Sequence, residues 1–225
     1  MKSAKSKCIM LTVILFAMTL VVSWGNRAQM QAIPAIHTVP DGWIPLFDGE
    51  TLDGWEIVRY GDEGEPHVEN GILILPKAVR GTMTGVRWVG DSLPAINYAI
   101  YYEARRVEGF DIFAALTFPY GDTYGSLIFS GWGGIVNGLS SINGDDASEN
   151  ETTQHFSFRN NQWYPVRLRV TTDSIRAYIG KDEIVRLATA GKIIHLRDDI
   201  LDTGLTLWTY LSTGEIRNMR IKKIR

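Results

Sequence analysis

The sequence has 225 residues, of which 45% are hydrophobic and 21% charged, and its formal net charge is −2. With 22 glycines and 8 prolines it is neither a low-complexity nor a collagen-like polymer. The balanced charge argues against a general nucleic-acid-binding protein, which would carry an excess of basic residues.

The N-terminal segment shows the three regions of a secretory signal peptide. Three lysines precede an uncharged apolar run over residues 9–22, and the small residues Ser23 and Gly25 follow that run. A membrane span needs about 20 apolar residues, so this run is short for one. We therefore predict a signal peptide over residues 1–28 and a secreted or periplasmic protein, with an uncleaved membrane anchor as the alternative.

Removal of this segment changes the charge and takes away the only cysteine, Cys8. The remaining chain has 19 basic and 25 acidic residues, and hence a net charge of −6. It has no cysteine nucleophile, no cysteine-ligated zinc and no iron–sulfur cluster. A chain of this size can still form a hydrophobic core without disulfides. Residues 29–40, with Pro34 and Pro40, are predicted to form an extended lead-in.

Beyond residue 40, apolar residues recur mostly with a period of two, which predicts half-buried β-strands. Turn sequences such as Asp53-Gly54, Asn70-Gly71 and Thr213-Gly214 separate these segments. Strands are predicted over residues 72–75, 86–89, 97–105, 112–118, 126–129, 166–170, 175–179, 184–188, 205–210 and 219–222. Many short strands without helices between them predict an all-β sandwich of two antiparallel sheets, formed by a single domain over residues 41–225.

Four motifs, in this order, resemble one family. Residues 42–55 read GWIPLFDGETLDGW, 67–73 read HVENGIL, 163–170 read WYPVRLRV, and 214–224 read GEIRNMRIKKI. Together they resemble the 3-keto-disaccharide hydrolase (3-keto-glucoside lyase/hydratase) domain family, which is common in secreted bacterial proteins. The resemblance implies a concanavalin A/laminarin-type jelly-roll sandwich. It also implies a hydrolase or lyase-type activity on 3-keto-glycosides or 3-keto-disaccharides.

Three segments depart from the family pattern and mark a divergent branch. Residues 207–214 stand where members often carry a Gln-x-His-Gly-like segment, and they contain no histidine. Residues 126–134 replace a central strand that ends in a Gln-x-x-Asp-like step. Gly180-Lys181 replaces a hairpin Asn-Gly. The family's activity is therefore not transferred to this chain from the motifs alone.

An acidic loop over residues 140–155 is a candidate for chemistry. Its carboxylates Asp145, Asp146, Glu149 and Glu151 lie within seven residues. Cleavage of a 3-keto sugar needs a base beside the ketone, a cation or donor for the enolate oxygen, and an acid for the leaving oxygen. We predict Asp145, Asp146 and Glu149 as catalytic, and all four carboxylates as ligands of calcium, magnesium or manganese. The alternative is a solvated loop without a site.

Further substrate contacts are predicted on either side of this loop. Trp132 lies in the flexible Gly131-Trp132-Gly133-Gly134 segment, Asn137 follows it, and His155 ends the acidic loop. A long loop that carries tryptophan and carboxylates in a compact domain is more often functional than not. We predict these three residues as substrate-binding.

The polar side of residues 97–105 forms a second candidate surface. Tyr101, Glu103 and Arg105 share one face of this strand. They are predicted to line a concave sugar-binding face, with Tyr101 and Arg105 binding and Glu103 catalytic. The alternative is an ion-pair ladder in which the partner strand supplies one of the arginines Arg167, Arg169 and Arg176. The large side chains of Trp163 and Trp208 are predicted to lie in the core.

Two functions remain open from the sequence. The first is a carbohydrate-active enzyme that cleaves 3-keto-glycosides, and the second is a non-catalytic, lectin-like carbohydrate-binding sandwich. A third, an exported structural or adhesive domain, has no specific feature in its favour. In the first two cases the expected partner is a carbohydrate, with no nucleic acid and no stable membrane span after signal cleavage. The motifs of zincins, nucleotide-binding enzymes and serine esterases do not occur.

Overall fold

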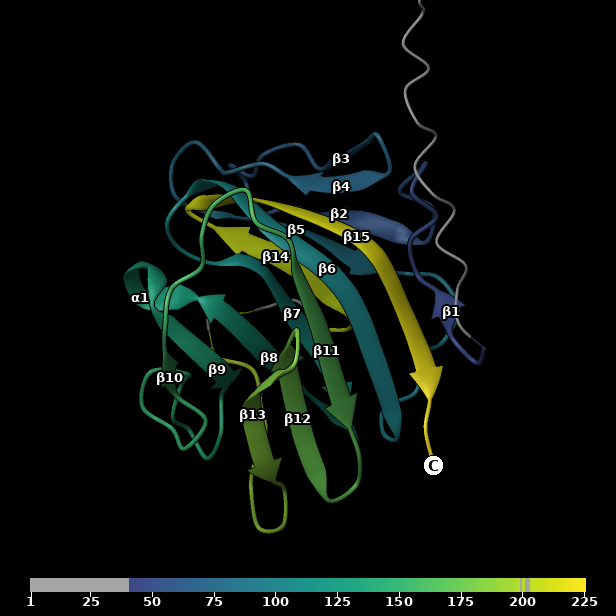
Figure 1. Ribbon diagram of the computed structural model, residues 1–225, viewed down its shortest axis with the longest axis vertical. Coiled ribbons are helices and arrows are strands. Elements are labelled where there is room, and N and C mark those ends of the chain that lie inside the picture. Colours follow the sequence, from purple (N-terminus) through teal and green to yellow (C-terminus); the bar gives the residue numbers. More distant parts are fainter. Residues whose placement is uncertain (1–40, 199, 201–202) are drawn as a thin grey trace, which may run out of the picture. The chain divides into compact units, whose positions relative to one another are not determined.

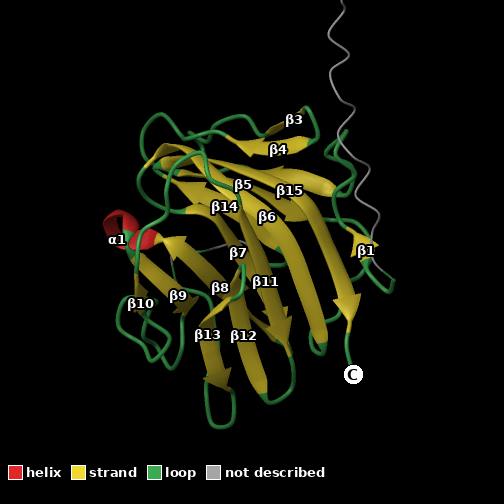
Figure 2. Ribbon diagram, viewed as in Figure 1, coloured by secondary structure: helices red, strands yellow, loops and turns green. Residues whose placement is uncertain are grey.

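The computed structural model describes residues 41–198, 200 and 203–225, which form two antiparallel sheets packed face to face (Figures 1 and 2). The two-sheet sandwich predicted from the sequence is therefore confirmed. The predicted signal peptide and lead-in lie outside the described residues. Within the described part, no helix has the length and apolar character needed to cross a membrane.

The first sheet has the strand order β13-β12-β11-β6-β15-β4-β3, with β1 also paired to β15. The bounds of its strands are β1 (Ile44–Pro45), β3 (His67–Glu69), β4 (Ile72–Leu75), β6 (Tyr98–Gly109), β11 (Tyr164–Val170), β12 (Ser174–Ile179), β13 (Asp182–Ala188) and β15 (Ser212–Lys223). The two longest strands, β6 and β15, lie side by side at its centre.

The second sheet has the order β10-β9-β8-β7-β14-β5-β2. The bounds of its strands are β2 (Trp55–Val58), β5 (Met83–Trp88), β7 (Phe113–Tyr120), β8 (Thr123–Ser130), β9 (Val136–Ser140), β10 (Gln154–His155) and β14 (Thr206–Tyr210). Between β8 and β9 lies the four-residue α1 (Gly131–Gly134), in which Trp132 and Gly133 have non-helical backbone angles.

The core lies between the sheets and follows the alternation of the sequence. On β6, Tyr98, Ile100, Tyr102 and Ala104 are buried, and the residues between them face outward. The Tyr102 hydroxyl donates to the Ala114 carbonyl at 3.0 Å, so its polar end is paired. Burial of each large apolar side chain contributes about 1.5–3 kcal/mol.

The prediction of a turn at Thr213-Gly214 is wrong, because both residues lie within β15. The chain turns two residues earlier: Leu211, with a φ of 52°, is the only residue between β14 and β15. The chain thus passes from the second sheet to the first at this point. A Cβ at Gly214 would lie 2.9 Å from the Thr209 side chain, so glycine is needed where the strands cross closely.

Candidate functional site

A cavity of about 490 Å³ lies on the outer face of the second sheet. Its walls come from strands and from the turns beside them. The lining residues are Tyr60, Thr82, Met83, Asp111, Ile112, Ser126, Ile128, Trp132, Ser140, Arg197, Ile200, Trp208 and Tyr210. The volume is within the range of small-molecule sites, and a mostly apolar lining with few polar groups is typical of them.

The floor of the cavity combines an indole with hydroxyl groups. Trp208 of β14 is 4% exposed, and its Nε1 donates to Thr117 Oγ1 at 3.2 Å. Thr117 Oγ1 also lies 3.1 Å from Ser126 Oγ, and Ser126 is the register partner of Ser140 on β9. The side chains of this layer point away from the core because Leu127 and Leu139, their neighbours in sequence, point into it.

A buried carboxylate lies at the edge of this floor, in the turn between β6 and β7. Asp111 is 5% exposed. Its Oδ1 accepts from the Ile112 N–H and its Oδ2 from the Gly133 N–H, both at 2.9 Å. The second bond holds the turn of Trp132, whose φ of 49° is left-handed. Trp132 remains 39% exposed and presents its ring at the rim.

Arg106 supports this arrangement from the core side. Its guanidinium donates to Ser130 Oγ at 2.6 Å, to the Phe158 carbonyl at 2.8 Å and to Asn160 Oδ1 at 2.6 Å. Burial lowers the pKa of Arg106 below its ordinary value, but an arginine remains charged at neutral pH. The turn at Ser130 is thus fixed by a charged, multiply bonded side chain.

Arg197 brings a positive charge to the cavity. Its guanidinium lies 5.5 Å from the centre of the Trp132 ring and 3.5 Å from Asp146 Oδ2. Asp146 Oδ1 accepts from the Ser148 N–H and hydroxyl at 2.8 and 2.6 Å. Of the four carboxylates of the predicted acidic loop, Asp146 is linked to the cavity, through its ion pair with Arg197.

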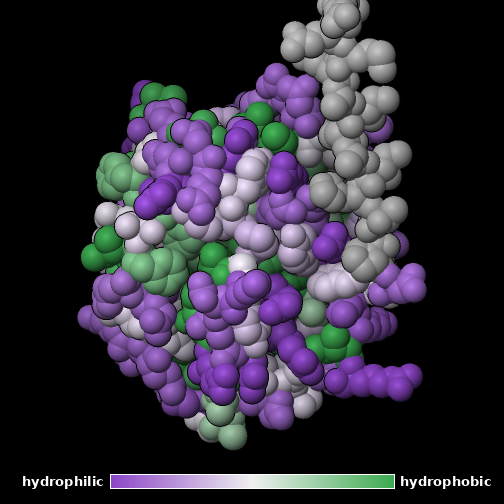
Figure 3. Space-filling view, in the orientation of Figure 1, coloured by the Kyte–Doolittle hydropathy of each residue, from purple (hydrophilic) through white to green (hydrophobic). Residues whose placement is uncertain are grey.

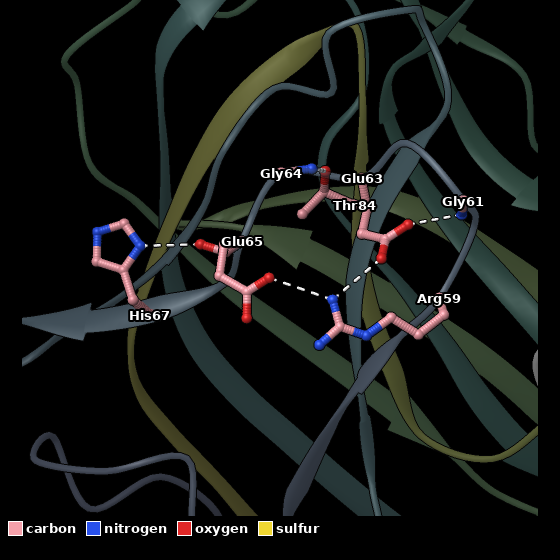
Figure 4. A network of polar contacts seen from close by, with 7 residues as sticks. All are labelled: Arg59, Gly61, Glu63, Gly64, Glu65, His67 and Thr84. Atoms are coloured by element: carbon pink, nitrogen blue, oxygen red, sulfur yellow. Dashed lines mark hydrogen bonds and ion pairs between the residues drawn. The ribbon is translucent and has the colours of Figure 1, made fainter.

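The loop between β2 and β3 contributes Tyr60 to the cavity lining, and Figure 4 shows the polar contacts of other residues in this loop. Arg59 in this loop bridges Glu63 and Glu65 at 3.1 and 3.2 Å, and the Gly64 N–H donates to Thr84 Oγ1 at 2.8 Å. Hydrogen bonds from its own backbone N–H and from Arg59 outweigh burial and hold the pKa of Glu63 below its ordinary value. These contacts order the segment that presents Tyr60.

A family model described as "3-keto-alpha-glucoside-1,2-lyase-like domain" matches residues 42–222. The chain belongs to this family. The family resemblance of the sequence motifs is thereby confirmed. No curated protein matches the chain in sequence.

Solved structures similar to this family domain show the fold. A Crh5 transglycosylase in complex with NAG is 10% identical, with a TM-score of 0.57 over 82% of this chain and 85% of that one. A candidate glycosyl hydrolase from Parabacteroides distasonis ATCC 8503 is 13% identical, with a TM-score of 0.54 over 82% and 95%. At these identities the likeness concerns the jelly-roll sandwich alone.

The other three carboxylates of the acidic loop, Asp145, Glu149 and Glu151, are not among the lining residues of the cavity. Asp145 and Glu149 are exposed, and Glu151 forms an ion pair with Lys192. Among the residues that the structure describes, no three His, Asp or Glu side chains are grouped so as to hold a metal ion. The four carboxylates predicted as metal ligands are thus not brought together.

Of the predicted substrate-binding residues, Trp132 lines the cavity and two neighbours do not. Asn137 is fully buried. Its Oδ1 accepts from the Ser130 N–H at 2.8 Å, and its Nδ2 donates to the Phe156 carbonyl at 2.9 Å. Through these hydrogen bonds the Asn137 side chain stabilises the α1 turn. His155 is exposed on the edge strand β10.

Tyr101, Glu103 and Arg105 lie on the outer face of the first sheet, away from the cavity. Glu103 binds Arg217 at 2.7 Å, and Arg105 forms an ion pair with Glu215. An ion-pair ladder therefore exists, but β15 supplies the partners. The expectation of Arg167, Arg169 or Arg176 as partners is wrong, because β15 places Arg217 opposite Glu103 in register.

The predictions for the two tryptophans have different outcomes. Trp163 is only half-buried, between the guanidinium groups of Arg105 and Arg217 at 4.6 and 4.1 Å, so its predicted core position is wrong. Trp208 is buried as predicted, but on the cavity side. The alternation of residues 205–210 could have indicated this, since Trp208 and Tyr210 share the face opposite Leu207.

Proposed function

We propose that the domain cleaves 3-keto-glycosides in the cavity of the second sheet, by elimination across C1–C2 followed by addition of water. The observation that carries this proposal is that one cavity contains a buried carboxylate, a guanidinium and several aromatic side chains in a domain of this family. These residues are Asp111, Arg197, Trp132, Trp208 and Tyr210.

The chemistry assigns a role to each polar group. A ketone at C3 makes the C2 proton acidic, and Asp111 removes it. Arg197 stabilises the enolate oxygen, and the Tyr210 hydroxyl donates a proton to the glycosidic oxygen as the C1–O bond breaks. The unsaturated ketone that remains then takes up water. Each oxygen of Asp111 accepts one N–H bond and keeps a further lone pair for the proton.

The number of carboxylates favours a keto-dependent reaction over ordinary glycoside hydrolysis. Glycosidases that act on unoxidised sugars use two carboxyl groups about 5–10 Å apart. The described lining residues of the cavity include one, Asp111. One base is sufficient for elimination beside a ketone, where Arg197 and Tyr210 supply the other two functions.

The test follows the C2 proton directly. The full chain is incubated in D₂O with a 3-keto-disaccharide and with its unoxidised parent, and NMR records deuterium at C2 and release of the sugar. We expect exchange and cleavage of the keto substrate alone. Asp111→Asn should abolish both, and Glu69→Gln, a charge-matched change on the distant β3, should not. Cleavage of the parent sugar would contradict the proposal.

Two further experiments test the predictions for the acidic loop. Loss of turnover in Asp146→Ala or Glu149→Ala at unchanged fold would locate the chemistry in that loop instead. Loss of turnover on treatment with EDTA, restored by calcium, magnesium or manganese, would support the predicted metal.

A lectin-like function is the second candidate. It is favoured by the fact that both oxygens of Asp111 already accept backbone hydrogen bonds, while aromatic faces and hydroxyl groups surround the cavity. Saturable sugar binding by calorimetry, without exchange at C2, would support it.

We also propose that the protein is exported, on the basis of its N-terminal segment. Support comes from the basic, apolar and small-residue regions of residues 1–28. Mass spectrometry of the protein from the periplasm or medium should show an N-terminus near residue 29. An intact N-terminus in a membrane fraction would favour the anchor.

A further inference from the structure

The outer face of the first sheet carries a row of basic side chains on four of five neighbouring strands. In register, Arg186 of β13 lies opposite Arg176 of β12, which lies opposite Arg169 of β11. Arg169 pairs with Ala99 of β6, and Ala99 with Lys222 of β15. Figure 1 shows these five strands side by side. We call Arg169, Arg176, Arg186 and Lys222 the basic row.

The basic row is poorly neutralised within the described part of the chain. Arg176 and Arg186 share a single carboxylate, Glu183. Arg169 and Lys222 form no direct ion pair with any described carboxylate, and Asp173 acts on Arg169 and Arg176 only at longer range. Strands lie about 4.8 Å apart, and like charges directly opposite each other destabilise a sheet. The fold therefore retains an unfavourable charge arrangement that a bound polyanion would relieve.

The next row of the same face adds guanidinium groups stacked on aromatic rings. The guanidinium of Arg167 lies 4.4 Å from the Tyr178 ring centre, and that of Arg220 lies 4.1 Å from the Tyr101 ring centre. The register Tyr178–Arg167–Tyr101–Arg220 alternates the two kinds of side chain across four strands. Arg220 Nε is buried and has no hydrogen-bond partner among the described residues.

The two rows hold six cationic side chains, in a chain that has more acidic than basic residues. In Figure 3 the surface in this view is mainly hydrophilic. We propose that this face binds a linear anionic polysaccharide, with its sulfate or carboxylate groups on the basic row. Guanidinium groups bind both kinds of anion through paired hydrogen bonds.

A polysaccharide fits this face better than a membrane does. Peripheral membrane binding combines electrostatic attraction to anionic lipids with apolar side chains that enter the lipid. Of the large apolar side chains exposed in the described residues, only Ile44 lies on a strand of the first sheet, whereas Trp132, Phe110 and Ile135 belong to the turns near the cavity. The proposal is independent of the proposed function, because the cavity lies on the other sheet.

The test measures binding of the full chain to fluorescent heparin and polygalacturonate oligosaccharides between low and physiological salt. We expect binding to at least one of them that weakens with salt. The double variant Arg169→Gln, Arg176→Gln should bind at least tenfold more weakly. The control variant Arg80→Gln, Arg159→Gln makes the same charge change at exposed loop positions and should lose less than twofold.

A second measurement separates binding from folding. Removal of like charges should leave the melting temperature of the double variant unchanged or raise it by about 1–3 °C. Three results would overturn the proposal: equal losses of binding in the double and control variants, a clear fall in the melting temperature of the double variant, or absence of binding to both oligosaccharides at low salt. Binding only to phosphatidylglycerol vesicles would likewise overturn it and identify a membrane surface instead.

Discussion

Asp111 Oδ2 accepts a hydrogen bond of 2.9 Å from the backbone N–H of Gly133, and this contact joins the turn after β6 to the turn that presents Trp132. Both residues come from turns rather than strands, and they are 22 positions apart. The proposed base and the proposed stacking surface are therefore held in a fixed relation. Changes at either turn should affect both.

Two adjacent glycines of α1 provide a matched test of this relation. Gly133 and Gly134 both have positive φ, of 82° and 104°. A Cβ at Gly133 meets nothing within 4 Å, whereas one at Gly134 would lie 2.4 Å from the Phe110 carbonyl oxygen. Gly133→Ala should cost about 1 kcal/mol of backbone strain, and Gly134→Ala about 3 kcal/mol or more. Urea unfolding measures both, and equal costs would contradict the predicted contact.

Trp132 should contribute to ligand affinity and little to stability, because 39% of its side chain is exposed at the rim of the cavity. We expect Trp132→Ala to weaken sugar binding about five- to tenfold, which corresponds to about 1 kcal/mol. Calorimetry or the KM of the keto substrate measures the change. Trp163→Ala, on the outer face of the first sheet, is the control. An equal loss in the control would show that Trp132 acts through the fold.

Arg106 should be critical for stability. Arg106→Lys keeps the charge but loses the planar fork, so acceptors such as the Phe158 carbonyl and Asn160 Oδ1 lose their donors. Each unsatisfied buried acceptor costs about 1–3 kcal/mol, and we expect a loss of about 3 kcal/mol in urea unfolding. Arg159→Lys, an exposed change between Phe158 and Asn160 in the sequence, should cost less than about 0.5 kcal/mol. A small loss at Arg106 would show that water replaces its hydrogen bonds.

Glu103 should make the domain sensitive to acid. Burial raises the pKa of Glu103, but hydrogen bonds from Arg217 and Asn218 outweigh it, so the pKa lies below its ordinary value of 4.5. A lowered pKa stabilises the folded state above pH 4.5, and this contribution is lost as the pH falls through the folded value. Glu103→Gln should therefore be less stable than the wild type at pH 7, and the difference should shrink below about pH 4.5. A constant difference across this range would contradict the assignment.

The alternation of the sequence was sufficient to predict most of the strands and the inward face of β6, but not β1, β2, β9 or β10. Period-two patterning is a local property, since a strand directs successive side chains to opposite sides whatever its neighbours are. The four family motifs, spread over residues 42–224, likewise indicated the jelly-roll sandwich before any pairing of strands was known.

The partners of those side chains depended on strand order, which alternation does not contain. Glu103 meets Arg217 across 114 residues because β15 lies beside β6. Asp111 follows no recognisable motif, and the sequence does not predict it as a site residue, because its role depends on the distant turn of Trp132. Trp208 was correctly expected to be buried, but its contact with the cavity depends on the layer of the sandwich to which β14 belongs.

The sequence by itself determined which side chains share a strand face, because that follows from backbone geometry over a few residues. The tertiary structure decided which faces and turns meet, because long-range packing sets the order of strands in each sheet. The cavity and the basic row both depend on this long-range packing. The cavity forms where two turns converge on the outer face of the second sheet, and the basic row forms where β11, β12, β13 and β15 bring three arginines and a lysine into register.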